Sequence, residues 1–206
     1  MSKPPTDYFA RAYNLKGPDD ARDFYDDWAN TYDATVLANT YETPRLVREA
    51  LVRLAVPTDA HLIDLGCGTG LVGEALHAAG YRTIDGLDLS AGMLEKAHAK
   101  AVYGELIQAD LLQPPTAVAD RAYEHGVSAG VFTHTHVGPE ALRECARMVQ
   151  PGGYLVTLVK ADFFKSAKFL SVIEALEADR VLLLERADET PYRSDLTARL
   201  LVMRVT

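Results

Sequence analysis

Three glycines that follow an acid and a short apolar run are the residues best placed for chemistry. The run is Leu62-Ile63-Asp64-Leu65, and the glycines are Gly66, Gly68 and Gly70. This order predicts a buried strand that turns sharply into a helix. Glycines at such a junction permit positive φ and let a ligand lie against the main chain, while the first turn of the helix offers unpaired N–H groups. We therefore expect a ligand site at this turn.

Asp64 separates this turn from an ordinary nucleotide-binding loop, because its carboxylate stands one residue before the expected end of the strand. A negative charge at that place suits a cationic ligand such as S-adenosylmethionine, which carries a sulfonium and an α-amino group beside its adenosine. The stretch resembles the first motif of the class I S-adenosylmethionine-dependent methyltransferases, an acid, any residue, and then Gly-x-Gly-x-Gly. Asp64, Gly66, Gly68 and Gly70 fill every position of that motif, and Cys67 lies within the same cofactor loop.

Two other interpretations of the glycines remain open. Gly68, Gly70 and Gly73 also satisfy the dinucleotide fingerprint, which holds a pyrophosphate at a helix N-terminus and would indicate a nicotinamide-dependent oxidoreductase. In that fingerprint the first glycine follows the strand directly, whereas Gly68 comes after Gly66 and Cys67. The remaining possibility is a tight turn from strand to helix that binds nothing.

Composition narrows the class of partner. The 206 residues include 21 Lys and Arg against 29 Asp and Glu, a net charge of −8, so the surface should repel nucleic acid. Cys67 and Cys145 are far apart and form no Cys-x-x-Cys pattern, which favours reduced thiols and argues against a disulfide or a zinc site. No secretory signal and no apolar run of membrane-spanning length is present. We therefore expect a soluble, cytoplasmic protein with no membrane partner.

Strands and helices alternate along most of the chain, which indicates parallel strands joined by helical crossovers. We expect one α/β domain of Rossmann-like type over residues 1–206, with N-terminal lid helices in 1–56 and the core in 57–206. The lid helices are expected at 17–30 and 43–54. In the core we expect strands at 62–65, 83–87, 104–108, 126–132 and 154–159, and helices at 71–79, 91–100 (capped by Ser90), 140–149 and 163–178.

The C-terminal part departs from the dinucleotide-binding pattern. The pattern predicts two strands, at residues 180–186 and 198–205. Only polar, turn-prone residues around 188–195 separate them, so there is no room for a crossover helix. They should pair antiparallel at one edge of the sheet. Five parallel strands finished by such a hairpin, with helices on both faces, resemble the seven-stranded class I methyltransferase fold.

Residues after the second and third strands extend the resemblance. Asp88 ends the second strand, where a carboxylate can accept hydrogen bonds from both ribose hydroxyls of adenosine. The family pattern Asp-x-Ser followed by Met-Leu matches this segment, which implies that Leu89 and Met93 wall the adenine. The family also places an acid after the third strand to accept a bond from the adenine amino group. Asp110 fills that position and Leu111 the one beside it.

The N-terminal leader carries a more particular resemblance. Tyr25, Trp28 and Tyr32 recur at a spacing that puts them on one face, if one helix runs through all three. Such a stripe is ordinarily core. The motif Tyr-Asp-x-Trp-Ala-x-x-Tyr-Asp resembles an N-terminal leader found in small class I methyltransferases, and it is most similar to that of the Williams–Beuren syndrome chromosome region 27-like family. The resemblance implies that the leader folds over the methionine end of the cofactor, where aromatic rings lie beside the sulfonium.

Two histidines follow the fourth strand. His134 and His136 should reach the edge of the sheet beside the cofactor loop, where either could act as a general base or contact the substrate. Their alternation also permits a metal pair, or a purely structural role, and no metal site is assigned. Methyl transfer needs mainly alignment of the nucleophile and exclusion of water.

The resemblance specifies the cofactor better than the acceptor. The segment after the fourth strand lacks the Asn-Pro-Pro-Tyr type of motif of methyltransferases that act on adenine or glutamine. We therefore expect transfer of a methyl group from S-adenosylmethionine, leaving S-adenosylhomocysteine, to an oxygen or nitrogen of a small molecule. A noncatalytic S-adenosylmethionine-binding module stays an alternative, and the sequence does not distinguish a monomer from a homodimer.

Overall fold

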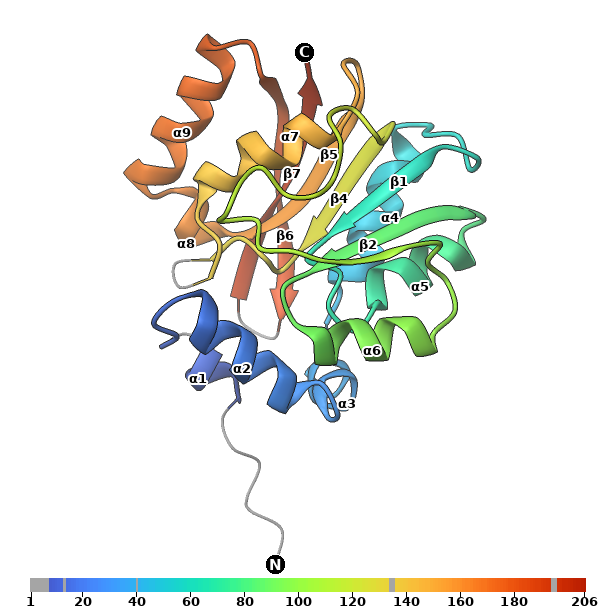
Figure 1. Ribbon diagram of the computed structural model, residues 1–206. Coiled ribbons are helices and arrows are strands. Elements are labelled where there is room, and N and C mark those ends of the chain that lie inside the picture. The colour runs from blue at the N-terminus through green and yellow to red at the C-terminus, as the bar shows by residue number, and fades with distance from the viewer. Residues whose placement is uncertain (1–7, 13, 40, 134–135, 194–195) are drawn as a thin grey trace, which may run out of the picture.

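The computed structural model describes residues 8–12, 14–39, 41–133, 136–193 and 196–206. One seven-stranded sheet runs through it in the order β3-β2-β1-β4-β5-β7-β6, with helices on both faces (Figure 1). The expected class I methyltransferase architecture is thereby confirmed. Because the strand order reverses at β1, the ends of β1, β2 and β4 form the kind of crevice at which open α/β sheets bind ligands.

The parallel part of the sheet holds five strands: β1 (His61–Leu65), β2 (Thr83–Asp88), β3 (Leu106–Gln108), β4 (His125–Ala129) and β5 (Tyr154–Lys160). The crossover helices are α5 (Leu71–Ala78), α6 (Ala91–Ala99) and α7 (Leu142–Met148), the last preceded by the short 3₁₀ helix η1 (Pro139–Ala141). β1 has an almost continuous apolar run because both of its faces are covered. Its central place positions the glycine turn in the middle of the sheet's carboxyl edge.

The C-terminal hairpin is longer than the sequence indicates. β7 (Leu196–Val205) lies antiparallel between β5 and β6 (Leu182–Arg193), which confirms the expected antiparallel finish. The polar residues after 187 were expected to form a turn, but β6 pairs with β7 as far as the Arg193 and Leu196 partners. Ladder pairing with β7 stabilises this segment despite its polar composition, because strand propensity is a weak and context-dependent preference. The extension carries Tyr192 toward the carboxyl edge of the parallel strands.

The second of the two expected lid helices belongs instead to the core. In α4 (Thr43–Arg53) the apolar stripe that includes Val47 and Leu51 is fully buried, in one cluster with Leu62 of β1 and Leu76 of α5. An amphipathic stripe shows that one helix face is buried but not what covers it. Of the segment predicted to form a lid, only the residues before α4 pack outside this cluster.

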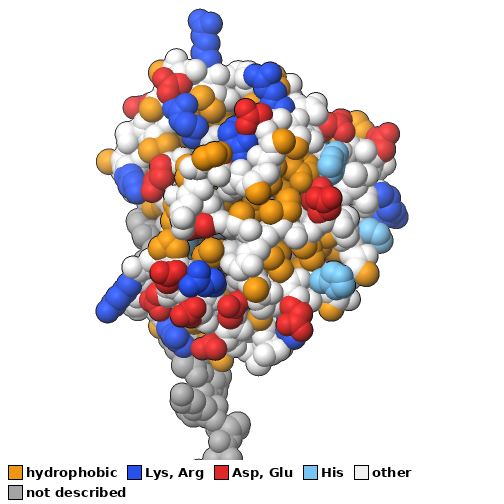
Figure 2. All heavy atoms as spheres, in the orientation of Figure 1, with side chains coloured by type: hydrophobic (Ala, Val, Ile, Leu, Met, Phe, Trp, Pro, Cys, Tyr) orange, Lys and Arg blue, Asp and Glu red, His pale blue; other side chains and the backbone are white. Residues whose placement is uncertain are grey.

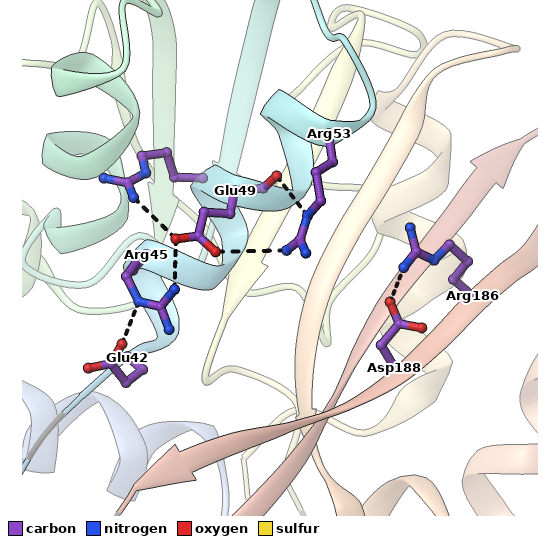
Figure 3. A network of polar contacts seen from close by, with 7 residues as sticks. Glu42, Arg45, Glu49, Arg53, Arg186 and Asp188 are labelled. Carbon is purple, nitrogen blue, oxygen red and sulfur yellow. Dashed lines mark hydrogen bonds and ion pairs between the residues drawn. The ribbon is translucent and has the colours of Figure 1, made fainter.

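The outer face of α4 is polar. Arg45 donates to Glu42 at 2.5 Å and to Glu49 at 2.7 Å, and Arg53 lies 3.9 Å from the Glu49 carboxylate (Figure 3). These are pairs three or four residues apart, the spacing at which helical side chains meet. On β6, Arg186 pairs with Asp188 in the same view. These ion pairs hold the side chains of Arg45 and Glu49 on the outer face of α4, opposite its buried apolar face.

The leader forms three short helices: α1 (Tyr8–Ala12), α2 (Pro18–Trp28) and α3 (Tyr32–Leu37). The expected helix ends at Trp28 rather than at residue 30, so Tyr32 begins a new helix and the three aromatic residues do not share one. Their rings are nevertheless in contact, with centroids 6.0 Å apart for Tyr25 and Trp28 and 4.7 Å for Trp28 and Tyr32. The leader lies below the sheet in Figure 1, beside α6.

Other boundaries differ by a few residues. The strand expected at 126–132 ends at Ala129, and the third strand begins only at Leu106. The helix expected at 163–178 is divided into α8 (Ala161–Phe164) and α9 (Ala167–Ala178), because the Ser166 hydroxyl caps α9 by accepting from the Phe169 amide at 3.2 Å. Within the described ranges, no helix is both long and apolar enough to cross a membrane.

Candidate functional site

The glycine turn after β1 is as sharp as its sequence predicts. Gly66 has φ of 73°, and its amide donates to the carbonyl of Leu87 at 2.7 Å. A Cβ at Gly66 would lie 2.1 Å from Cγ2 of Val131, so a side chain has no room. Gly70 adopts the left-handed region as the residue that caps α5. The backbone therefore passes close to the end of β2 and then opens onto the first turn of α5.

Asp88 links the end of β2 to this turn. One carboxylate oxygen accepts from the amide of Gly68 at 2.8 Å, and the other accepts from the amide of Ser90 at 2.9 Å. Burial raises the pKa of Asp88, while these backbone donors act in the opposite direction. Each oxygen can accept a further hydrogen bond, since a carboxylate offers about four acceptor positions. Asp88 is thus fixed in place with acceptor capacity left for a ligand.

A cavity of about 120 Å³ opens at this edge of the sheet. Ten of the residues expected from the sequence line it: Tyr25, Tyr32, Gly66, Gly68, Asp88, Leu89, Met93, Asp110, Leu111 and His136. Four others do not: Asp64, Cys67, Gly70 and Trp28. His134 lies outside the described residues. The sequence therefore predicted half of the residues that line the cavity, because the carboxyl ends of parallel strands meet at one edge.

Asp64 does not face this cavity. Its side chain is fully buried beneath the turn, and one carboxylate oxygen accepts from the Tyr103 hydroxyl at 2.7 Å. Its other oxygen has no hydrogen-bond partner within the described chain. Burial raises the pKa of Asp64 to about 7, and the Tyr103 hydrogen bond opposes that rise. The Tyr103 hydroxyl also accepts from the Gly73 amide at 3.2 Å, so Asp64 is linked through Tyr103 to the first turn of α5.

The far end of the cavity is apolar with one acid. Met93 and Leu111 are almost fully buried, and Leu89 stands beside them. Asp110 accepts from the amide of Leu112 at 2.8 Å and from the side-chain amide of Gln113 at 3.0 Å. Apolar walls with one fixed carboxylate suit a flat heteroaromatic ring that carries an exocyclic amino group.

Two leader aspartates, which the sequence reasoning did not assign, attach the leader to the core. Asp26 accepts from the Ser90 hydroxyl at 2.5 Å and from the amide of Gly92 at 2.8 Å, at the beginning of α6. Asp33 accepts from the hydroxyl of Thr69 and pairs with Lys100 at 2.9 Å. Each of them follows a tyrosine in the leader motif. This repeated Tyr-Asp pair is the sequence signal that could have identified the two aspartates. The acids hold the aromatic side chains of the leader over the cavity.

His136 is placed at the boundary between leader and core. Its Nε2 lies 3.2 Å from the Tyr25 hydroxyl, and its Nδ1 is hydrogen-bonded to the hydroxyl of Thr133. Burial, with a smaller contribution from the charge of Lys160, lowers the pKa of His136 to about 4. A neutral imidazole with both nitrogens engaged can position a ligand, but it is a weak base at neutral pH.

The geometry fits S-adenosylmethionine better than a dinucleotide. No group of three potential metal ligands occurs among the residues that the structure describes. The fixed carboxylate of Asp88 suits a pair of ribose hydroxyls, and the Met93 and Leu111 end suits adenine. Tyr25 and Tyr32 line the part of the cavity under the leader. The Gly68 amide, which a pyrophosphate at this turn would use, already donates to Asp88, and this disfavours a dinucleotide.

Comparison with known proteins agrees with this geometry. Residues 63–157 match the family model described as Methyltransferase domain. Over these residues the chain is similar to methyltransferase domains. The matched part of the chain begins in β1 and reaches into β5, so it includes the glycine turn, Asp88 and Asp110. The leader and the C-terminal hairpin lie outside it.

Similar proteins differ in what they are named for. Human Methyltransferase-like protein 27 is 34% identical over 158 residues, which are 75% of this chain and 62% of that protein. The Arabidopsis thaliana 18S rRNA (guanine-N(7))-methyltransferase RID2 is 44% identical over 72 residues, which are 34% of this chain and 25% of that protein. The chain therefore spans less than two thirds of the length of either relative.

A solved structure shows the same fold. The TehB-like SAM-dependent methyltransferase from Corynebacterium glutamicum superposes with a TM-score of 0.66 and 23% sequence identity. The superposition covers 88% of this chain and 98% of that one. At this identity the likeness establishes the arrangement of strands and helices, and the acceptor must be argued from the side chains.

Proposed function

We propose that this protein transfers a methyl group from S-adenosylmethionine to an oxygen or nitrogen of a small-molecule acceptor. The observation that carries the proposal is the position of Asp88. Its carboxylate is tied to the glycine turn through the Gly68 amide and still faces a cavity that is apolar at its far end. A nucleoside with a cationic extension matches such a cavity in shape and polarity.

Each part of the cavity has a separate role in this proposal. Asp88 accepts hydrogen bonds from the ribose hydroxyls, Leu89 and Met93 contact the adenine ring, and Asp110 accepts from its amino group. The glycine turn lets the cofactor approach the main chain. Asp64 acts indirectly, because its place behind the turn stabilises the loop conformation rather than a charge on the ligand.

Methyl transfer requires little chemical participation from any single side chain. The sulfonium of the bound cofactor supplies an activated methyl carbon. The protein aligns a nucleophile in line with it and keeps water away. Tyr25 and Tyr32 close the cavity from the leader side, and their electron-rich rings favour a neighbouring positive charge. His136 holds its place at the boundary through Tyr25 and Thr133, which makes it a positioning group for the acceptor.

The charge of the surface supports a small acceptor rather than RNA. The chain carries a net charge of −8, and acidic side chains gather over the leader in Figure 2. A polyanion approaching the cavity would also meet the exposed Asp19, Asp20 and Asp23 of α2, the helix whose Pro18 and Ala21 line the cavity. The similarity to the plant rRNA enzyme is confined to about a third of the chain.

Isothermal titration tests the cofactor. S-adenosylmethionine and S-adenosylhomocysteine should both bind, and NAD should not. If neither S-adenosylmethionine nor S-adenosylhomocysteine binds, the proposal is overturned. Binding of NAD alone would favour the oxidoreductase interpretation.

A second experiment separates an enzyme from a noncatalytic binding module. The protein is incubated with methyl-labelled cofactor and a fractionated metabolite extract. We expect label in at least one low-molecular-mass compound. Cofactor binding without transfer to any fraction would indicate the binding module. Label found only in a parallel incubation with total RNA would overturn the small-molecule acceptor.

A further inference from the structure

A second, smaller cavity adjoins the first under the leader. The two cavities share Tyr25, Tyr32, Gly130 and His136 in their walls. The second cavity extends away from Asp88 and Asp110, which line only the first. Its position beyond the tyrosines of the leader is where a molecule would lie if it met the methyl end of the cofactor.

Its far wall is built from segments that are distant in the sequence. Tyr41 precedes α4 and Tyr192 lies near the end of β6, and their rings are 6.3 Å apart in an edge-to-face arrangement. A Cβ built on Gly130 would lie 3.1 Å from the Tyr41 hydroxyl and 3.9 Å from the Tyr192 hydroxyl. Both hydroxyls therefore converge over the residue that follows β4. They place two phenolic hydroxyls at one point of the cavity wall.

Lys160 supplies positive charge to the same cavity. It is the last residue of β5, and its half-buried side chain lines the second cavity but not the first. No carboxylate occurs among the described residues that line this cavity. A lysine in this place is notable in a chain of net charge −8. The positive charge of Lys160 also contributes to the lowered pKa of His136, because it opposes protonation of the ring.

We propose that the second cavity binds the methyl acceptor, and that the acceptor is a small, planar or aromatic carboxylic acid. This inference rests on the proposed methyl transfer. The carboxylate is held by Lys160 and the hydroxyls of Tyr41 and Tyr192. The nucleophilic atom lies at the boundary shared by the two cavities, beside Tyr25 and His136.

The charges favour this acceptor over the alternatives. An ammonium group would be repelled by Lys160, although aromatic walls alone would favour it. A neutral acceptor would take a place beside the lysine without using its charge. A carboxylate is attracted to Lys160, and the attraction is stronger under the leader than in water because the surrounding rings exclude solvent. The flat walls of Tyr25, Trp28 and Tyr32 suit a planar frame.

The transfer step balances with these groups. A lone pair of the acceptor's nucleophile forms the new bond to the methyl carbon as the carbon–sulfur bond breaks. That electron pair stays on sulfur, which becomes a neutral thioether. When the nucleophile is a hydroxyl, its proton is released to bulk water. The anchoring carboxylate is unchanged, so Lys160 sets specificity and does not take part in bond making.

Matched probes test the anchor. Salicylate and salicylamide share one planar frame and differ in charge, and their binding is measured by saturation-transfer NMR and calorimetry with S-adenosylhomocysteine at saturation. We expect salicylate to bind at least tenfold more tightly than salicylamide. Lys160→Met should remove that preference, Lys160→Arg should keep most of it, and Lys165→Met, which removes an exposed lysine outside the cavity, should leave it unchanged.

The outcomes distinguish this inference from the proposed function. Equal binding of the two probes, or no binding of either to the complex with S-adenosylhomocysteine, would overturn the carboxylate acceptor and leave the cofactor assignment intact. Failure of S-adenosylhomocysteine itself to bind would overturn the proposed function first. The comparison of the probes on the unmodified protein does not depend on how well any variant folds.

Discussion

The carboxylate of Asp88 accepts a hydrogen bond of 2.8 Å from the backbone amide of Gly68, so the end of β2 and the turn after β1 are held as one unit. The same side chain lines the cavity at the carboxyl edge of the sheet. One residue thus shapes the cofactor loop and presents an acceptor to whatever the loop binds. Removing it should affect both functions.

Asp88→Ala should weaken binding of S-adenosylhomocysteine by about 1–3 kcal/mol, the range for losing hydrogen bonds to a charged group. The fold should persist, because Asp88 is the last residue of β2, at the carboxyl end of the strand. Isothermal titration measures the affinity, with Asp59→Ala at an exposed turn as the control. Unchanged affinity would show that the ribose assignment is wrong.

Gly66→Ala should disrupt the cofactor loop. The new methyl group would lie 2.1 Å from Val131 Cγ2, and φ of 73° is unfavourable for alanine. We expect at least a tenfold loss of affinity for S-adenosylhomocysteine, partly recovered when Val131→Ala is added. Gly152→Ala is the matched control, because Gly152 has φ of 85° with open space around its Cβ position. It should lower stability by about 1–2 kcal/mol and leave the affinity unchanged. Equal affinity losses in Gly66→Ala and Gly152→Ala would contradict a steric cause.

Asp64→Asn should stabilise the ligand-free protein at alkaline pH. The folded pKa is raised to about 7 from an ordinary value of 3.8, so between these values the folded state retains a proton that the unfolded state loses. The contribution of Asp64 to stability is therefore complete at low pH and is lost as pH rises through about 7. The free energy of unfolding of the variant, relative to the unmodified protein, should increase from pH 5 to pH 8 by about 3 kcal/mol, because the folded pKa of Asp64 lies about two pH units above pH 5.

Denaturant unfolding at the two pH values measures that difference. Asp59→Asn serves as the control, since the exposed Asp59 side chain lacks the buried surroundings that raise the pKa of Asp64. The same gap between Asp64→Asn and the unmodified protein at pH 5 and pH 8 would show that Asp64 is not a buried acid of raised pKa.

Asp26→Ala should loosen the leader. Asp26 accepts hydrogen bonds from Ser90 and Gly92, and without them α2 is held mainly by its aromatic contacts. We expect faster cleavage between α2 and α4 in limited proteolysis and a several-fold weaker affinity for S-adenosylhomocysteine. Asp27→Ala removes the exposed neighbouring charge on the same helix and should change neither. Identical behaviour of the two variants would contradict the docking role of Asp26.

Local sequence determined the scaffold of the candidate site. The apolar run before Gly66, the three glycines and the alternation of strands and helices correctly predicted the parallel sheet and the sharp turn. Ser90 caps α6 as expected, because its hydroxyl accepts from the amide of Met93 at 3.0 Å. These features depend on residues a few positions apart, and strand and helix periodicity together with glycine chemistry express them directly.

Tertiary structure decided where the side chains lie relative to one another. Asp64 was expected to face a ligand, but the strand turns it beneath the loop toward Tyr103. α4 was expected to be a lid, but its apolar face packs against the core. Tyr25 meets His136 across 111 positions of sequence, and Tyr41 meets Tyr192 only because β6 extends beyond its expected turn. Such contacts follow from the packing of whole elements, and no local pattern of residue types encodes them.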